Sequence, residues 1–216
     1  MYRSQGQPGA FAVSAPSLLG QVLGITGVGF LITAAAAYAT QGVPYGVSLI
    51  AMLVGFGFLI AINATRTNEA LGLVFFYLFT LCEGIGIGPV IGNYVRTIGP
   101  EVVVQAASTT GLGMLSLACL VFMTSIDFRK LQGVAFFALI GLVLVGLVSL
   151  FVRFIHPETY AWLTLGVFTL LVLVDFARIR AGGQGANAVQ LATSIYLDAI
   201  NIFLALLQIF GGRRRD

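Results

Sequence analysis

Seven apolar runs divide this sequence, and each is long enough to cross a lipid bilayer, which needs about 20 residues. Only 9% of the 216 residues are charged, against about 25% in soluble domains. Lipid offers no partner to unpaired backbone groups, so the runs must be helices. The sequence therefore predicts an all-α integral membrane protein with seven transmembrane helices. The runs cover residues 17–40, 45–63, 69–93, 102–124, 132–155, 159–178 and 187–210.

The breaks between the runs are short, so neighbouring helices must be antiparallel and no soluble domain is inserted between them. We expect a flexible N-terminal tail at residues 1–16, a seven-helix domain at 17–210 and a basic tail at 211–216. The 27 glycines are frequent inside the runs, where small residues let helices pack closely in lipid.

The basic residues lie at the ends of the runs, where they set the orientation of a membrane protein rather than bind nucleic acid. One side carries six and the other five, of which three belong to the C-terminal tail. Without the tail the count is six against two, so we expect the N-terminus in the cytoplasm, although the tail opposes this. We expect the protein to lie in the cell (inner) membrane. The six are Arg3, Arg66, Arg129, Lys130, Arg178 and Arg180, and the five are Arg96, Arg153, Arg213, Arg214 and Arg215.

The last run carries a polar stripe with Asp198 near the middle of the membrane. A carboxylate at the bilayer centre costs roughly 2.5–3.5 kcal/mol, so such residues are candidates for function. A polar face should not contact lipid, so we expect the seventh helix to lie inside the bundle, surrounded by the other six. Hydrogen-bonding between helices would explain the amides and serine, but not the aspartate. The stripe consists of Asn187, Gln190, Ser194, Asp198, Asn201 and Gln208, in steps of 3, 4, 4, 3 and 7.

Two further carboxylates lie within runs. Asp175 is near the end of the sixth run, where it could be an interfacial residue paired with Arg178 three positions later. Arg66 ends the second run on the same side and is an alternative partner. Glu83 lies in the middle of the third run, and either a hydrogen-bonded acid or a residue lining a pathway fits it.

Asp175 and Asp198 would form a special pair if the fold brings them together. Two aspartates in a low-dielectric interior cannot both ionise cheaply, so they would share a proton and respond to pH. Once deprotonated they would offer oxygen ligands to a hard cation such as Ca²⁺. Two carboxylates alone make a weak metal site, which suits conduction better than storage.

Other kinds of site are excluded by the residues available. His156 is the only histidine and Lys130 the only lysine, and both lie in breaks, so a histidine metal site, a catalytic triad and a retinal Schiff base are ruled out. No nucleotide-binding or hydrolase motif occurs, and neither aspartate has the GxGD context of an intramembrane protease. Cys82 and Cys119 are expected to be buried thiols. We therefore expect no catalysis and no cofactor beyond a weakly bound or transported Ca²⁺.

The segment SIYLDAINIFLALLQIFG resembles the C-terminal signature of the Bax inhibitor-1 (transmembrane Bax inhibitor motif) family, and FTLCEGIGIGP and LVDFARI are weaker matches. The resemblance covers residues 17–210. It implies seven helices around a central last helix and a pH-sensitive Ca²⁺ leak through the bundle. In bacterial members like YetJ it also implies an aspartate pair latched by an arginine, at positions matching Asp175, Asp198 and Arg66 here.

The sequence departs from the family around Asp175. An aromatic residue often precedes this aspartate and a polar residue follows two or three positions later, whereas Val174, Ala177 and Arg178 stand here. Arg178 could therefore replace Arg66 or compete with it as the latch.

Three functions fit these observations. The first is a pH-gated Ca²⁺ leak channel, closed when the pair is protonated and opened by carboxylate repulsion. Its pathway would be lined by Glu83, Asn187, Gln190, Ser194 and Asn201. The second is a proton-coupled transporter, which the absence of an evident inverted repeat disfavours. The third is a non-conducting regulator that binds a protease or another membrane protein. For each we expect a monomer in the bilayer.

Overall fold

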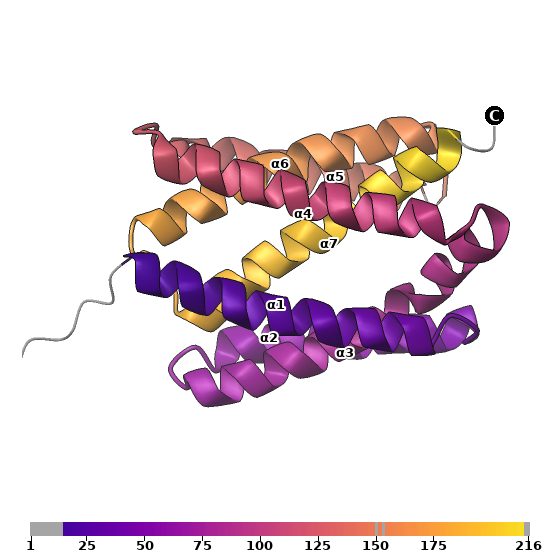
Figure 1. Ribbon diagram of the computed structural model, residues 1–216, viewed down its shortest axis with the longest axis horizontal. Coiled ribbons are helices and arrows are strands. Elements are labelled where there is room, and N and C mark those ends of the chain that lie inside the picture. Colours follow the sequence, from indigo (N-terminus) through magenta and orange to yellow (C-terminus); the bar gives the residue numbers. More distant parts are fainter. Residues whose placement is uncertain (1–14, 150, 153, 214–216) are drawn as a thin grey trace, which may run out of the picture.

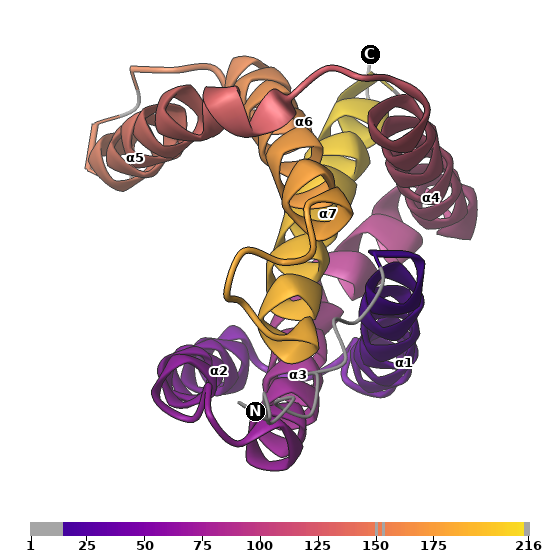
Figure 2. The same cartoon turned by 90° about the vertical axis from the view of Figure 1, so that its left-hand side faces the viewer.

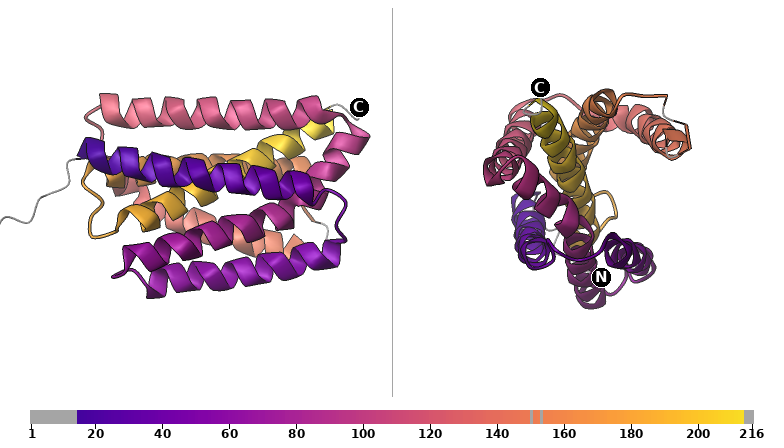
Figure 3. Two further views of the ribbon diagram at one scale, coloured as in Figure 1. Left: turned by 60° about the horizontal axis from the view of Figure 1, so that its bottom comes forward. Right: turned by 90° about the vertical axis from the view of Figure 1, so that its right-hand side faces the viewer.

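The structure is a computed structural model that describes residues 15–149, 151–152 and 154–213. This part of the chain contains helices and no strand, and seven of its helices are long and apolar enough to cross a membrane. Figure 1 shows them lying roughly side by side, and Figure 3 shows the loops at the two ends of the bundle. The predicted all-α class and the seven spans are confirmed. The elements are α1 (Ala15–Ala39), α2 (Tyr45–Ala64), α3 (Glu69–Thr97), α4 (Pro100–Met123), η1 (Phe128–Leu131), α5 (Gln132–Ser149), α6 (Pro157–Arg180) and α7 (Ala188–Arg213).

The helix ends differ from the predicted runs by more than two residues at three places. Helix α3 continues through Pro89 to Thr97, so the loop before α4 is shorter than predicted. Helix α5 ends at Ser149, six residues before the end of the predicted run. The run was predicted too long because the sequence stays apolar beyond the helix. Helix α7 includes Gly211–Arg213, which were predicted to belong to the tail. Residues 1–14 and 214–216 lie outside the described residues, and with them most of the predicted N-terminal tail and half of the predicted C-terminal tail.

Helix α7 is the most buried of the seven spans and lies between two groups of helices. It packs on α1, α3 and, slightly, α2 on one side, and on α4 and α6 on the other (Figure 2). Helix α5 packs on α6 and η1 and makes at most marginal contact with α7. The predicted arrangement of six helices around the last one is therefore not confirmed, because one side of α7 faces the space between α2 and α5.

Tyr196 fixes α7 against α1 and α3. Its ring is fully buried and packs against Phe30, Phe76 and Phe79, with ring centroids 5.2–5.6 Å away. Its hydroxyl lies 2.5 Å from Thr33 Oγ1, which donates in turn to the Thr80 carbonyl at 2.9 Å. Because Thr33 has a single hydroxyl hydrogen, Tyr196 must be the donor to it. The tyrosine thus brings its polar end into the membrane without leaving it unpaired.

Glycines on one face of α3 allow α1 to lie unusually close. A Cβ at Gly84 would lie 2.6 Å from the Thr33 carbonyl oxygen and 2.7 Å from the Ala36 Cβ. A Cβ at Gly92, two turns further along, would lie 2.6 Å from the Gln41 carbonyl oxygen. The predicted role of glycine in close packing holds for these positions. Many other glycines face open space, among them Gly24 and Gly27 of α1.

Arg180 ties the end of α6 to the end of α4. Its guanidinium donates to the carbonyls of Val121, Thr124 and Ile126, with lengths of 2.6 Å for the last two. Backbone carbonyls at a helix C-terminus have no partner within the helix and carry partial negative charge, which a cation there stabilises. In the following loop Asp127 accepts from the Arg129 side chain at 2.7 Å, which holds the pKa of the Asp127 carboxyl below its usual range.

We expect Gly84→Ala to destabilise the α1–α3 contact, because its methyl group would overlap backbone atoms that cannot rotate away. Overpacking of this kind costs about 1–3 kcal/mol. Thermal unfolding of the purified protein in detergent should show a lower midpoint than wild type. Gly27→Ala, on α1 where a Cβ meets nothing within 4 Å, is the matched control. Equal midpoints for the two variants would contradict this account of the packing.

Candidate functional site

The polar stripe of α7 is the face of that helix that the other helices leave least covered. Between positions 187 and 208 every half-buried residue lies on this face, and every other residue is buried. Asp198 belongs to the stripe but is buried as well. The half-buried residues recur in steps of 3 and 4, the spacing of one helix face. The stripe predicted from the sequence therefore marks the open side of α7. The half-buried residues are Asn187, Gln190, Ser194, Leu197, Asn201, Leu204 and Gln208.

Four cavities follow this face from one end of α7 to the other. The first, near the start of α7, is about 490 Å³ and is lined by Gln190 and Ser194. The second, which we call the central cavity, is about 1050 Å³ and contains both aspartates. The third and fourth, of about 270 and 520 Å³, reach Gln208. Each cavity shares lining residues with the next, so together they border the whole stripe.

The central cavity brings Asp175 and Asp198 together, and their role as a functional pair stays a prediction. Both side chains are buried, at 8% and 5% exposure, and they are close enough to interact electrostatically. Arg178 Nη1 donates to Asp175 Oδ1 at 3.0 Å, and Ser194 on α7 also interacts with the Asp175 carboxyl. Asp198 Oδ2 is the one buried side-chain oxygen or nitrogen of the described residues that has no hydrogen-bond partner.

Of the two arginines considered as partners of Asp175, the structure pairs it with Arg178. The pair lies within one turn of α6 and is partly shielded, with side-chain exposures of 26% and 11%. Arg66 lies just after α2 and is exposed, and within the described chain it forms no ion pair. Its backbone carbonyl instead accepts from Asn187 Nδ2 at 2.9 Å. The latch role of either arginine stays a prediction.

Asn187 and Gln190, predicted to line a pathway, also build the start of α7. The Asn187 side chain accepts from the Gln190 backbone N–H at 2.9 Å, and the Gln190 side chain accepts from the Asn187 N–H at 3.3 Å. This reciprocal pattern is a capping box, which satisfies two backbone donors at a helix N-terminus. Of the two, only Gln190 lines one of these four cavities. The bond from Asn187 to Arg66 joins this cap to the loop between α2 and α3.

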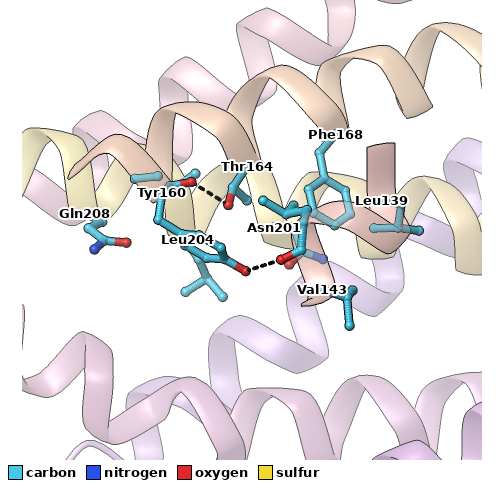
Figure 4. A pocket seen from close by; sticks show the side chains of 11 residues that line it. Leu139, Val143, Tyr160, Thr164, Phe168, Asn201, Leu204 and Gln208 are labelled. Atoms are coloured by element: carbon cyan, nitrogen blue, oxygen red, sulfur yellow. Dashed lines mark hydrogen bonds between the residues drawn. The ribbon is translucent and has the colours of Figure 1, made fainter. Parts of the chain in front are cut away.

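The second half of the stripe carries amide side chains, and helix α6 contributes hydroxyl groups to the same cavity. Asn201 lines the central and third cavities and donates to the Leu197 carbonyl at 2.8 Å, which leaves its side-chain oxygen available. Figure 4 shows the third cavity, where Asn201 and Gln208 lie opposite Tyr160 and Thr164 of α6. Tyr160 Oη donates to the Leu142 carbonyl of α5 at 3.3 Å. Polar groups thus continue beyond the two aspartates.

Glu83 lies apart from the cavities. It is half-buried on α3, close enough to Tyr196 to interact electrostatically, and it is not among the residues that line the four cavities. The alternative of an acid held within the bundle fits this position better than a pathway residue. Cys82, beside it, is half-buried, and the expectation of a buried thiol is wrong for Cys119, which is exposed on the apolar surface of α4.

The donor set of the central cavity suits a transient cation rather than a tightly held metal. Within the described residues no group of three or more histidine, cysteine, aspartate or glutamate side chains gathers at one place. Ca²⁺ takes 6–8 oxygen ligands, so two carboxylates would need water and neighbouring oxygens such as those of Ser194 and Asn201. The site could hold a partly hydrated ion and release it easily.

Sequence reasoning missed the contribution of α5 and α6 to these cavities. Gln132, at the start of α5, lines the central cavity, and Tyr160 and Thr164 line the third. Tyr160 and Thr164 are four positions apart and so lie on one helix face. That spacing is a signal the sequence contained, whereas nothing near Gln132 indicates which helix it faces.

The sequence matches the family described as inhibitor of apoptosis-promoting Bax1 over residues 15–215. The chain belongs to this family. Together with the seven apolar helices, this makes it a multi-pass membrane protein of Bax inhibitor-1 type. The resemblance that the C-terminal segment suggested is therefore confirmed over nearly the whole chain.

Bacterial relatives support the same conclusion. An uncharacterised membrane protein of Vibrio cholerae is 32% identical over 190 residues, which cover 84% of this chain and 83% of the relative. A protein of Pseudomonas aeruginosa is 31% identical, covering 81% and 80%. The modulator of FtsH protease YccA of Escherichia coli is 28% identical, covering 78% of this chain and 77% of its own.

We expect Arg178→Ala to destabilise the protein by about 1–3 kcal/mol, because it leaves the buried Asp175 carboxylate without its charged partner. Arg66→Ala, which removes an exposed side chain, should stay within about 0.5 kcal/mol of wild type. Adding Asp175→Asn to Arg178→Ala should restore part of the loss, as a double-mutant cycle measures. Thermal unfolding in detergent provides the readout. A larger loss for Arg66→Ala than for Arg178→Ala would show that Arg66 is the true partner.

Proposed function

We propose that this Bax inhibitor-1 family protein is a pH-sensitive leak pathway for cations, Ca²⁺ in particular, along the polar face of α7. The observation that carries the proposal is the series of four cavities that share lining residues and follow that face from Gln190 to Gln208. A stripe that served only to hold helices together would be covered by them, whereas this one borders open space.

The aspartate pair supplies the control in this proposal. While Asp175 and Asp198 share a proton, the central cavity holds little net charge, since Arg178 balances Asp175, and the closed packing is favoured. Loss of that proton places two carboxylates around one Arg178 in the same low-dielectric cavity. Repulsion between them then separates α6 from α7. Their negative charge attracts a hard cation, which two carboxylates bind weakly enough to release.

A second function is favoured by one relative. The Escherichia coli relative is named a modulator of the FtsH protease, so regulation of a membrane-bound protease is the alternative for this chain. A bacterial inner-membrane location, like that of the inner membrane protein YccA of another Escherichia coli strain, and a cytoplasmic N-terminus fit either function. Co-purification of a stoichiometric membrane partner, with regulation intact in Asp198→Asn, would favour this alternative over conduction.

Purified protein in liposomes should pass Ca²⁺ faster at about pH 8 than at about pH 6, because the pair loses its shared proton. We expect Asp198→Asn to reduce the flux at the higher pH by about tenfold or more and to flatten its pH dependence, since an interaction with a charged group of about 1.5–3 kcal/mol is lost. A Ca²⁺ dye trapped in the liposomes measures the flux. Glu101→Gln, at the exposed start of α4, is the matched control. No flux above empty liposomes at any pH would refute the leak function.

Cysteine accessibility tests the route itself. In a background with Cys82→Ala and Cys119→Ala, cysteines placed at Ser194, Asn201 and Gln208 should react with a small water-soluble thiol reagent. A cysteine placed at Ile202, next to Asn201 but buried on another face of the helix, should react at least about tenfold more slowly, because a buried thiol lacks access to water and reagent. Mass spectrometry of the labelled protein in liposomes gives the rates. Equal rates at positions 201 and 202 would mean that water does not follow the stripe.

A further inference from the structure

The central cavity opens sideways toward the bilayer between α2 and α5. Its lining includes Phe56 of α2 and Phe136 and Val143 of α5. These three side chains are 62%, 56% and 49% exposed, so they form a rim on the lipid-facing surface. Helices α2 and α5 do not pack on each other in the described part of the chain, and in Figure 2 both lie to the left of α7, α5 above and α2 below. An apolar molecule dissolved in the bilayer could therefore enter from the side.

The interior has the character of a small-molecule site. Its volume of about 1050 Å³ lies just above the usual range for sites of drug-sized ligands, and its walls are mostly apolar, with Leu139, Phe168 and Leu171 among them. Of its charged groups, Asp175 and Arg178 already satisfy each other. Asp198 does not have such a partner, since it is 5% exposed and its Oδ2 lacks a hydrogen bond. An unpaired carboxyl in the wall of a mostly apolar cavity calls for a cationic donor.

The position of Asp198 narrows the class of ligand. It lies ten residues after the start of α7, about 15 Å along the helix and close to the middle of a bilayer core about 30 Å thick. The headgroup of a phospholipid stays at the membrane surface and does not reach this depth. A compact apolar body that carries one protonated nitrogen does reach it, because the body dissolves in the hydrocarbon and the nitrogen finds its counter-ion in the cavity.

We propose that the central cavity binds lipophilic amines, with the apolar body between α2 and α5 and the protonated nitrogen paired with the Asp198 carboxylate. Binding needs no ion flux, so the proposal rests on the proposed function only in that both use Asp198. If that carboxyl also lines the cation pathway, a bound amine blocks the pathway.

The test compares 4-phenylbutylamine with 4-phenylbutan-1-ol, a neutral molecule of the same shape. Each is titrated calorimetrically into the full chain in nanodiscs without Ca²⁺, and the heat from empty nanodiscs is subtracted. We expect saturable binding of one amine per chain, at least about tenfold tighter than binding of the alcohol, because a hydrogen bond to a charged group is the stronger one. Asp198→Asn should bring the affinity for the amine down to that for the alcohol. Glu101→Gln should leave both affinities unchanged.

A second variant keeps the test decisive if Asp198→Asn does not fold. Val143→Trp fills the opening from α5 without altering Asp198, so it should weaken binding of both the amine and the alcohol at least about tenfold by overlap with the apolar body. Equal affinity of the two molecules for wild type, or amine binding unchanged in Asp198→Asn or Val143→Trp, would overturn the proposal. Since the titration contains no Ca²⁺, failure here leaves the leak function standing. Binding of the amine without any Ca²⁺ flux in liposomes would support this proposal and refute the leak function.

Discussion

The structure depends on how a carboxyl group near the middle of the bilayer is kept away from lipid. Asp198 carries that constraint, and the helix around it has two different sides. One side is held by aromatic and aliphatic packing on α1, α3, α4 and α6, and the other borders a series of cavities. Polar side chains recur on the second side at every turn or two, so any ion or water that reaches Asp198 meets further oxygens before and after it. The cost of burying one carboxyl is thereby spread over a polar surface.

The position of α7 follows from contacts made far from the aspartates. Tyr196 points away from the stripe and is enclosed by Phe30, Phe76 and Phe79, with its hydroxyl hydrogen-bonded to α1. The glycines of α3 let α1 approach so closely that Thr33 can bridge the Thr80 carbonyl and Tyr196. Helices α1, α3 and α7 thus form a unit with little freedom. The ion pair of Asp175 with Arg178 belongs to α6, which is not part of this unit.

Much of this arrangement was predictable from the sequence because lipid permits few alternatives. Runs of about 20 apolar residues had to become helices, and the spacing of Asn187, Ser194 and Asp198 had to place them on one face. Periodicity says which residues share a face, but not which helix covers it. For that reason the displaced position of α5, the lateral opening beside it and the contribution of Gln132 were not found. The end of α5 at Ser149 was missed because apolar residues continue past it, and only the end of the backbone ladder marks the boundary.

The choice between Arg178 and Arg66 shows the same limit at the scale of one ion pair. Sequence allowed both, since each ends a helix on the same side of the membrane. Arg178 follows Asp175 by three positions on α6, so the helix itself places the two side chains together and no loop has to become ordered. Arg66 would have to reach Asp175 from the α2–α3 loop. That loop is already held by the hydrogen bond from the Asn187 side chain to the Arg66 carbonyl. The Arg66 side chain itself is exposed. A pair local to α6 moves with its helix, so separation of α6 from α7 would carry Asp175 and Arg178 away together. Asp198 would then remain on α7 without a cationic side chain beside it, so the two carboxylates would meet the incoming cation from separate helices.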